Sequence, residues 1–377
     1  MNIGNLPDYL SAVKTLRLSL LLGAMLAAGF AQRAAPPATA AATPKVVAAA
    51  NAFLATLSDA DRAKATFDFN SPQKTTGWSN LPSGIFQRNG LRLADLTAQQ
   101  RDAAMATVAA ALSKSGYQKV LDIMNGDEVL KNQGGGRTGG RPGAPAGGPP
   151  GAPAAGGGGR GGGRGGIVFG RDEYFLAFLG APSTTNPWML QFGGHHLAIN
   201  VTVVGSDNVM TPSLPAAQPA RYVLNGQTIR PLGNENDKGF ALINALDENQ
   251  QKQAILNYQV RDLVLGPGND GKVIQPEGML ASAMNAKQQE MLLDIAHEWV
   301  GILNDEGAAA KMAEIKANLP KTYFAWSGST SNGGLAYYRI QGPTVVIEYA
   351  PQQGDLDHIH TIYRDPTNDY GARLVKK

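Results

Sequence analysis

The stretch that decides the fold is LAYYRIQGPTVVIEY, residues 335–349. Two runs rich in β-branched and aromatic residues, Leu335 to Gln341 and Thr344 to Tyr349, flank a Gly-Pro pair that is typical of a tight turn. The pattern predicts two antiparallel strands joined as a hairpin. Further strands are expected at Tyr174–Leu179, Met189–Val204, Thr322–Trp326 and His358–Tyr363.

Helices are expected before and between these strands. A helix-start pattern, in which a short polar residue is followed three positions later by an acid or amide, occurs at Ser58, Thr97, Asp247 and Asn285. The likeness among these starts stops at the caps, so no internal repeat is inferred. Helices and strands come in blocks, which predicts an α+β fold with an antiparallel sheet flanked by several amphipathic helices. The other expected helices are Lys45–Leu57, Tyr117–Leu130 and Gly307–Leu319.

The first 31 residues have the features of a cleavable signal peptide. Lys14 and Arg17 precede an apolar run, Leu18 to Phe30, and small residues lie at its end. The run is shorter than the roughly 20 apolar residues of a membrane-spanning helix, so no stable span is expected after cleavage. We therefore expect a periplasmic or secreted protein. Residues 32–44 are expected to form a flexible lead-in, and residues 45–377 a single α+β domain.

Residues 134–166 interrupt that domain with a segment composed almost wholly of Gly, Pro, Ala and Arg. Such a composition has little apolar surface to bury and predicts a disordered loop. Its arginines resemble those of RNA-binding segments, but the segment has no aromatic residue for stacking on bases, and the net charge of the chain is only +3. A nucleic-acid partner is therefore not expected. The absence of cysteine excludes disulfides and thiolate metal sites.

Histidine is scarce, with 5 in the chain, and most of them lie in the motifs His195-His196 and His358-x-His360. On a strand, the His-x-His spacing places both rings on one face. If Gly193 to Thr202 is also a strand, His196 faces its small, polar side and His195 its apolar side. We predict a metal site formed by His196, His358 and His360 with His195 nearby. Three histidines suit a divalent ion such as zinc, or alternatively copper or iron.

Three charged residues near these motifs are candidates for catalysis. Glu348 could be a fourth ligand, a partner of a ligand or a general base. Arg339 or Arg364 could bind a substrate anion or stabilise negative charge. His297, on a predicted helix, is expected to be an ordinary surface or packing residue.

Two functions remain open at this point. One is an exported metal-dependent enzyme, hydrolase-like, acting on a small-molecule or peptide substrate. The other is a non-catalytic periplasmic ligand-binding or scaffold protein, in which histidines and carboxylates form a structural network. Convergence of the histidines on an open cleft would favour the enzyme, whereas burial against carboxylates would favour the scaffold.

The sequence contains five separated motifs: Leu57-Ser58-Asp59, Gly90-Leu91-Arg92-Leu93-Ala94-Asp95-Leu96-Thr97, Gly193-Gly194-His195-His196-Leu197, Tyr337-Tyr338-Arg339-Ile340-Gln341-Gly342-Pro343-Thr344, and His358-Ile359-His360-Thr361 through Asn368-Asp369-Tyr370-Gly371. In this order they resemble the family called domain of unknown function 3500. The resemblance implies one domain from about Val46 to the carboxyl end, of a kind common in exported bacterial proteins, and implies no established activity. The family's characteristic histidines fall on His195, His196, His358 and His360, with Arg339, Glu348, Arg364 and Asp365 nearby.

Overall fold

The computed structural model describes residues 39–134 and 166–376, and Pro37–Lys377 form one compact unit. The predicted signal peptide and nearly all of the Gly/Arg segment lie outside the described residues. Helix α1 begins at Thr39 and continues through Pro44 to Ala55, so the last part of the predicted flexible lead-in is helical. The helix is longer than predicted because its buried side, which includes Ala42 and Val46, packs on the core.

The predicted helix starts are confirmed. Side chains of Thr97, Asp247 and Asn285 form reciprocal capping boxes with the glutamine three positions later, and Ser58 accepts from the amide of Asp61. Helix α6, Gly233–Ala245, was not predicted, because its start has no side-chain cap and its first turn is Gly- and Asn-rich. The remaining helices are α2 Asp59–Ala65, α3 Gln73–Thr76, α4 Ala98–Ala111, α5 Lys114–Asn132, α7 Glu248–Ala254, α8 Ala286–Val300, α9 Asp305–Ala317 and α10 Ala372–Val375.

The predicted hairpin is confirmed as part of a five-stranded antiparallel sheet. Its strands pair in register about the Pro343-Thr344 turn, so that Arg339 lies opposite Glu348 and Gly342 opposite Val345. The strands, in the order in which they pair, are β10 Met279–Leu280, β11 Tyr323–Gly328, β12 Ala336–Gly342, β13 Val345–Pro351 and β14 Ile359–Arg364.

A second sheet contains the first histidine motif, and here one prediction was wrong. Residues 189–204 do not form a single strand, because β4 ends at Gly194 and β5 begins at Leu197. His195 and His196 form the turn of a hairpin, and His196 has a φ of 59°, so the two residues do not alternate between faces of a strand. The sheet is mixed, since β1 pairs parallel with β3. Its strands are β1 Thr66–Phe67, β2 Leu91–Arg92, β3 Phe175–Leu179, β4 Trp188–Gly194, β5 Leu197–Val204, β6 Asp207–Val209 and β7 Leu214–Pro215.

The two sheets belong to halves that repeat the same order of elements, which the sequence analysis did not infer. In each half two helices precede a long segment, and a short strand, a 3-10 turn, two further helices and four strands that pair antiparallel then follow. Equivalent contacts recur: Leu91 pairs with Leu176, and Met279 pairs with Phe324. Gly90 and Gly278 precede these pairs with φ of +95° and +89°, and a Cβ on either would lie 2.2 Å from a carbonyl oxygen of the facing strand. The sequence shows the same correspondence, since Gly90, Thr97 and Gln100 have the same spacing as Gly278, Asn285 and Gln288.

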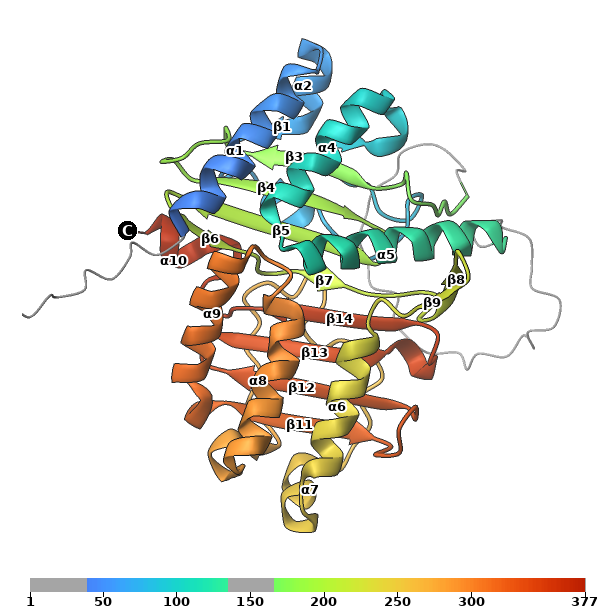
Figure 1. The fold of residues 1–377 in the computed structure, drawn as a ribbon, viewed down its shortest axis with the longest axis vertical. Coiled ribbons are helices and arrows are strands. Elements are labelled where there is room, and N and C mark those ends of the chain that lie inside the picture. The colour runs from blue at the N-terminus through green and yellow to red at the C-terminus, as the bar shows by residue number, and fades with distance from the viewer. Residues whose placement is uncertain (1–38, 135–165, 377) are drawn as a thin grey trace, which may run out of the picture. The chain divides into compact units, whose positions relative to one another are not determined.

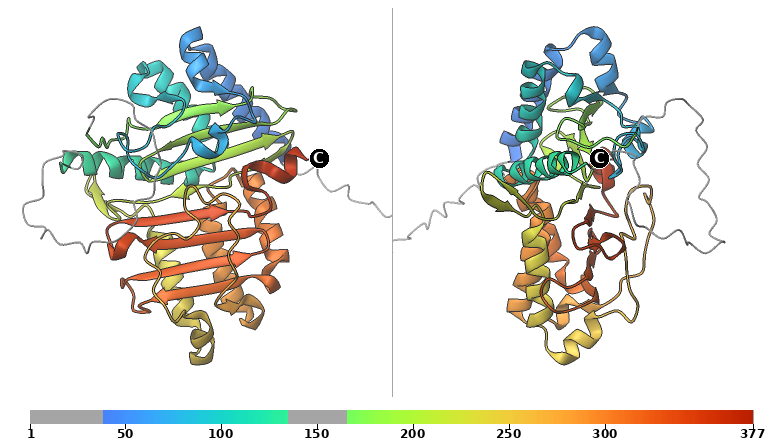
Figure 2. Two further views of the ribbon diagram at one scale, coloured as in Figure 1. Left: turned by 180° about the vertical axis from the view of Figure 1, so that it is seen from behind. Right: turned by 90° about the vertical axis from the view of Figure 1, so that its right-hand side faces the viewer.

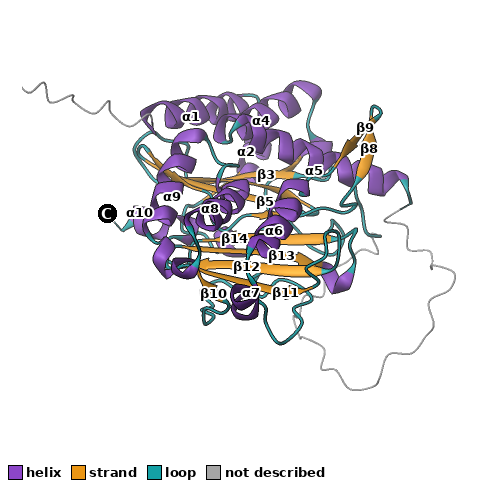
Figure 3. Cartoon of the chain, turned by 60° about the horizontal axis from the view of Figure 1, so that its bottom comes forward, coloured by secondary structure: helices purple, strands orange, loops and turns teal. Residues whose placement is uncertain are grey.

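The halves meet where the segment containing β7 runs between β5 and β14. Ser213 and Ala217 form isolated bridges to Tyr363 and Ile359 of β14, while Leu214 and Pro215 pair with β5. Across the two sheets the strands therefore lie in the order β3, β4, β5 and then β14, β13, β12, β11. The long helices of both halves cover the same face (Figure 1). In Figure 3, from another direction, α1 and α4 lie above β3, and α6 and α8 lie over the strands of the second sheet. The small hairpin of β8 Tyr222–Leu224 and β9 Gln227–Ile229 lies beside the junction.

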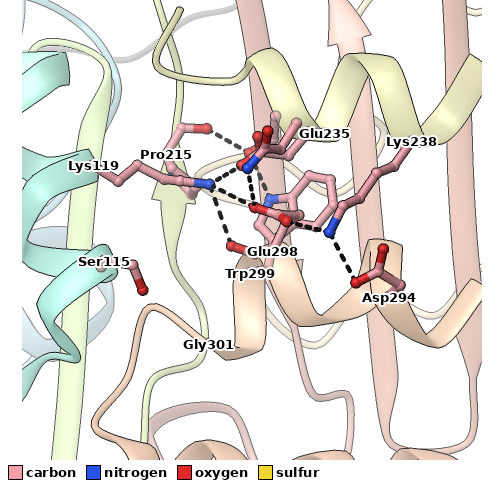
Figure 4. Close-up of polar contacts among 12 residues, drawn as sticks. Ser115, Lys119, Pro215, Glu235, Lys238, Asp294, Glu298, Trp299 and Gly301 are labelled. Carbon is pink, nitrogen blue, oxygen red and sulfur yellow. Dashed lines mark hydrogen bonds and ion pairs between the residues drawn. The ribbon is translucent and has the colours of Figure 1, made fainter.

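A buried charge network ties the halves together on the helix face (Figure 4). Lys119 of α5 forms ion pairs with Glu235 of α6 and Glu298 of α8. Glu298 also pairs with Lys238, with 2.6 Å between the charged atoms. Glu235 is fully buried, and this burial raises the pKa of its carboxyl. The network orients α5 of the first half against two helices of the second.

Candidate metal centre

The histidine motifs meet at the junction of the two halves, on different strands. His196 lies in the β4–β5 turn, His358 directly precedes β14, and His360 is the second residue of β14. The β7 segment connects them, because the amide of Ala216 donates to the carbonyl of His196 and the amide of Ala217 donates to that of Ile359. Backbone pairing therefore places the three rings at one point.

The three rings present the same atom to one another. His358 Nε2 lies 2.8 Å from His196 Nε2 and 3.1 Å from His360 Nε2. Zinc bound tetrahedrally at about 2.0–2.1 Å holds its ligand nitrogens about 3.3 Å apart, so a small outward movement of the rings would admit the ion. One ligand atom from each of the three lies within 4.8 Å of the others. The donor set and its spacing fit a divalent metal ion.

Two residues that the sequence analysis missed orient His360. Asp262 Oδ1 lies 3.0 Å from His360 Nδ1, and Asn80 Nδ2 lies 3.3 Å from His360 Nε2. Burial raises the pKa of Asp262, but the hydrogen bond and charge of His360 outweigh this, and the net pKa is lowered. An ionised Asp262 accepts a hydrogen bond from Nδ1–H of His360 and leaves Nε2 as the unprotonated nitrogen, which accepts from Asn80. This is the arrangement of a carboxylate that supports a metal-binding histidine.

Burial also keeps the other two rings neutral. His196 is 1% exposed, and burial together with the charges of neighbouring histidines holds its pKa well below the ordinary value. Burial, with repulsion from His360, lowers the pKa of the half-buried His358 to about 4. Neutral imidazole is the metal-ligating form, so both rings are in that form at neutral pH.

His195 lies beside the centre but turns toward a different partner. Its Nδ1 lies 2.8 Å from Oδ1 of Asp127, a buried residue of α5, and the other oxygen of Asp127 accepts from Tyr174 at 2.8 Å. The ring of His195 lies against that of His196, with 3.6 Å between ring centroids and 32° between the ring planes. The turn itself is held by Arg88, which donates to the carbonyl of Gly194.

The three predicted catalytic residues occupy the face of the second sheet that lies away from the helices. A long segment, residues 255–278, covers this face (Figure 2). Glu348 accepts from the amides of Val264 and Leu265, and Arg364 donates to the carbonyl of Leu265. Arg339 pairs with Glu277 of the same segment, 2.8 Å away. Among the described residues, no hydrogen bond or ion pair joins these three side chains to a histidine of the centre.

The other residues near the motifs have structural contacts. Asp365 is fully buried and forms an ion pair with Lys311 at 2.5 Å. His297 is exposed on α8, as expected. The centre thus shows both features that were set as alternatives: its three rings converge, and it is largely buried, with a carboxylate bound to His360.

Comparison with known families decides the relationship. The family model described as "Protein of unknown function (DUF3500)" matches residues 39–372. The chain belongs to this family. The match covers both halves of the fold and every histidine discussed above, which agrees with the resemblance seen in the motifs. No curated protein and no solved structure was found to match the chain. Within the described residues, none of the helices is sufficiently long and apolar to cross a membrane.

Proposed function

We propose that the protein is an exported metal-dependent enzyme, hydrolase-like, with His196, His358 and His360 as ligands. The single observation that supports this most is the convergence of three Nε2 atoms, two of them within 3.1 Å of the third. Export is supported by the basic, apolar and small-residue pattern of the first 31 residues.

Zinc is the metal we favour, with copper or iron as alternatives, because all three accept imidazole ligands. Three protein ligands leave a coordination position open, and a bound ion supplies Lewis acidity to a water or substrate there. We assign Asp262 the role of positioning His360. Glu348, Arg339 and Arg364 are assigned to holding residues 255–278, since their polar groups already bind that segment.

A second candidate function is a non-catalytic ligand-binding or scaffold protein. It is favoured by the burial of His196 and His360 and by the carboxylate partners of His195 and His360. In that case the histidines and carboxylates would stabilise the junction between the halves, with no open coordination position.

The first experiment measures metal in untagged protein by elemental analysis, beside a His358→Ala, His360→Ala double variant. His297→Ala is the matched control, because this histidine is exposed and remote in sequence from both motifs. We expect near-stoichiometric metal in the wild type and the control, and none in the folded double variant. Absence of metal from the wild type, even after each ion is added back, would overturn the proposal.

A second measurement separates the enzyme from the scaffold. Cobalt(II) replaces zinc with little change in geometry, and its visible absorption reports the coordination number. If a position is open, addition of azide will change the spectrum of the cobalt protein. A spectrum that azide leaves unchanged would indicate a closed centre and favour the scaffold.

A further inference from the structure

The ring of His196 has a second nitrogen that the three-histidine centre does not use. Its Nε2 faces His358, while its Nδ1 is buried and has no hydrogen-bond partner among the described residues. The corresponding nitrogen of His360 is satisfied by Asp262. A metal-binding histidine ordinarily has its other nitrogen bound to a carboxylate, a carbonyl or water, so a buried Nδ1 without a partner calls for an explanation.

A second group of potential ligands lies against the same ring. One ligand atom from each of Asp127, His195 and His196 lies within 4.8 Å of the others. All three residues are buried, at 1%, 5% and 1% exposure. Tyr174 fixes the carboxylate of Asp127 through a hydrogen bond of 2.8 Å, and the ring of His195 lies in contact with that of His196. These ligands come from α5 and the β4–β5 turn, which the fold brings together independently of β14.

We propose that the protein binds a second metal ion through Asp127, His195 and Nδ1 of His196, so that the ring of His196 is shared between two ions. The proposal rests on the proposed function, since His196 ligates the first ion through Nε2. Coordination at both nitrogens releases the ring proton to solvent. The negative charge of the resulting ring is shared by the two ions, and the Asp127 carboxylate adds a second negative charge beside the second ion.

The chemistry of these ligands defines the class of ion. Two imidazole nitrogens and one carboxylate oxygen suit zinc or copper(II) better than magnesium or calcium, which favour oxygen ligands. The positive charge of the Arg88 guanidinium is near this group, since it acts to lower the pKa of both His196 and Asp127. Its Nη2 is engaged by the carbonyls of Ser79 and Gly194, so Arg88 holds the turn in place.

The test loads untagged protein with excess copper(II), removes the unbound ion and compares copper content with the spin count from electron paramagnetic resonance. We expect two copper ions per chain and a spin count well below the copper content, because two ions joined by one ring couple magnetically. We expect Asp127→Asn to bind one ion with a full spin count. His297→Ala should match the wild type in both measurements.

The outcomes separate this inference from the proposed function. If the wild type and Asp127→Asn each bind one ion, and the His358→Ala, His360→Ala variant binds none, the second site is overturned and the first remains. One ion lost from Asp127→Asn but kept by the double variant would overturn the first. Two ions with a full spin count would refute the shared ring. If Asp127→Asn does not fold, His195→Gln is used in its place. The spin count of the copper-loaded wild type tests the shared ring without any variant.

Discussion

Substitution of Glu348 by glutamine tests whether this residue is structural or belongs to the metal centre. The Glu348 carboxylate is fully buried and accepts from the amides of Val264 and Leu265 at 3.0 and 2.8 Å. It also accepts from the Tyr337 hydroxyl at 2.7 Å. Glutamine keeps one acceptor oxygen but turns an amide group toward at least one of these donors, which then has no acceptor.

The magnitude follows from these contacts. A hydrogen bond to a charged group contributes about 1.5–3 kcal/mol, and an unsatisfied buried donor costs about 1–3 kcal/mol. We therefore expect Glu348→Gln to lower the free energy of unfolding by about 2–5 kcal/mol, a large fraction of the roughly 5–15 kcal/mol of a typical domain. Urea unfolding followed by tryptophan fluorescence measures the change.

The control for this substitution is Glu290→Gln, in which the side chain is 70% exposed. It should change stability by less than about 0.5 kcal/mol. Metal content of folded Glu348→Gln should equal that of the wild type. An unchanged unfolding free energy together with lost metal would refute the reasoning and return Glu348 to the metal centre.

Three further predictions follow from the same structure. Asp262→Asn should weaken metal affinity about 10–100-fold, because His360 loses its orienting carboxylate; competition with a chelator measures the change. The control is Asp294→Asn, whose side chain is 60% exposed and whose substitution should leave metal affinity unaltered. In metal-free protein, the stability that neutral His358 provides should be present above pH 6.5 and be lost as the pH falls to about 4, because the unfolded chain takes up this proton first. Unfolding measured at a series of pH values tests this, and a stability that does not change between pH 6.5 and 4 would contradict it. Gly278→Ala should lower the free energy of unfolding by about 3 kcal/mol or more, since its Cβ would lie 2.2 Å from the Phe324 oxygen. The control Gly271→Ala, which has open space and a φ of +74°, should lower it by about 1–2 kcal/mol in the same assay.

Much of the fold could be predicted because its signals are local. A cap at Thr97 or Asn285 requires only the residue three positions later, and the Gly342-Pro343 hairpin requires only its two flanking runs. The repeat of the two halves was not predicted, because the likeness around Gly90 and Gly278 is confined to a short segment of each half, and only the structure shows that the two glycines have the same role. The His195-His196 turn was predicted as strand, since its apolar alternation continues on both sides of a reversal.

The sequence by itself determined the α+β class, the starts of four helices, the family, and the four histidines that form the cluster. Only the tertiary structure decided which nitrogens face one another, and which carboxylates support them. Asp262 and His360 are separated by 98 residues and Asp127 and His195 by 68, so their contacts depend on how segments pack. Glu348 and His360 have side chains on the same face of the sheet, yet the backbone amides of residues 255–278 bind Glu348, because a buried carboxylate requires donors and that segment supplies them.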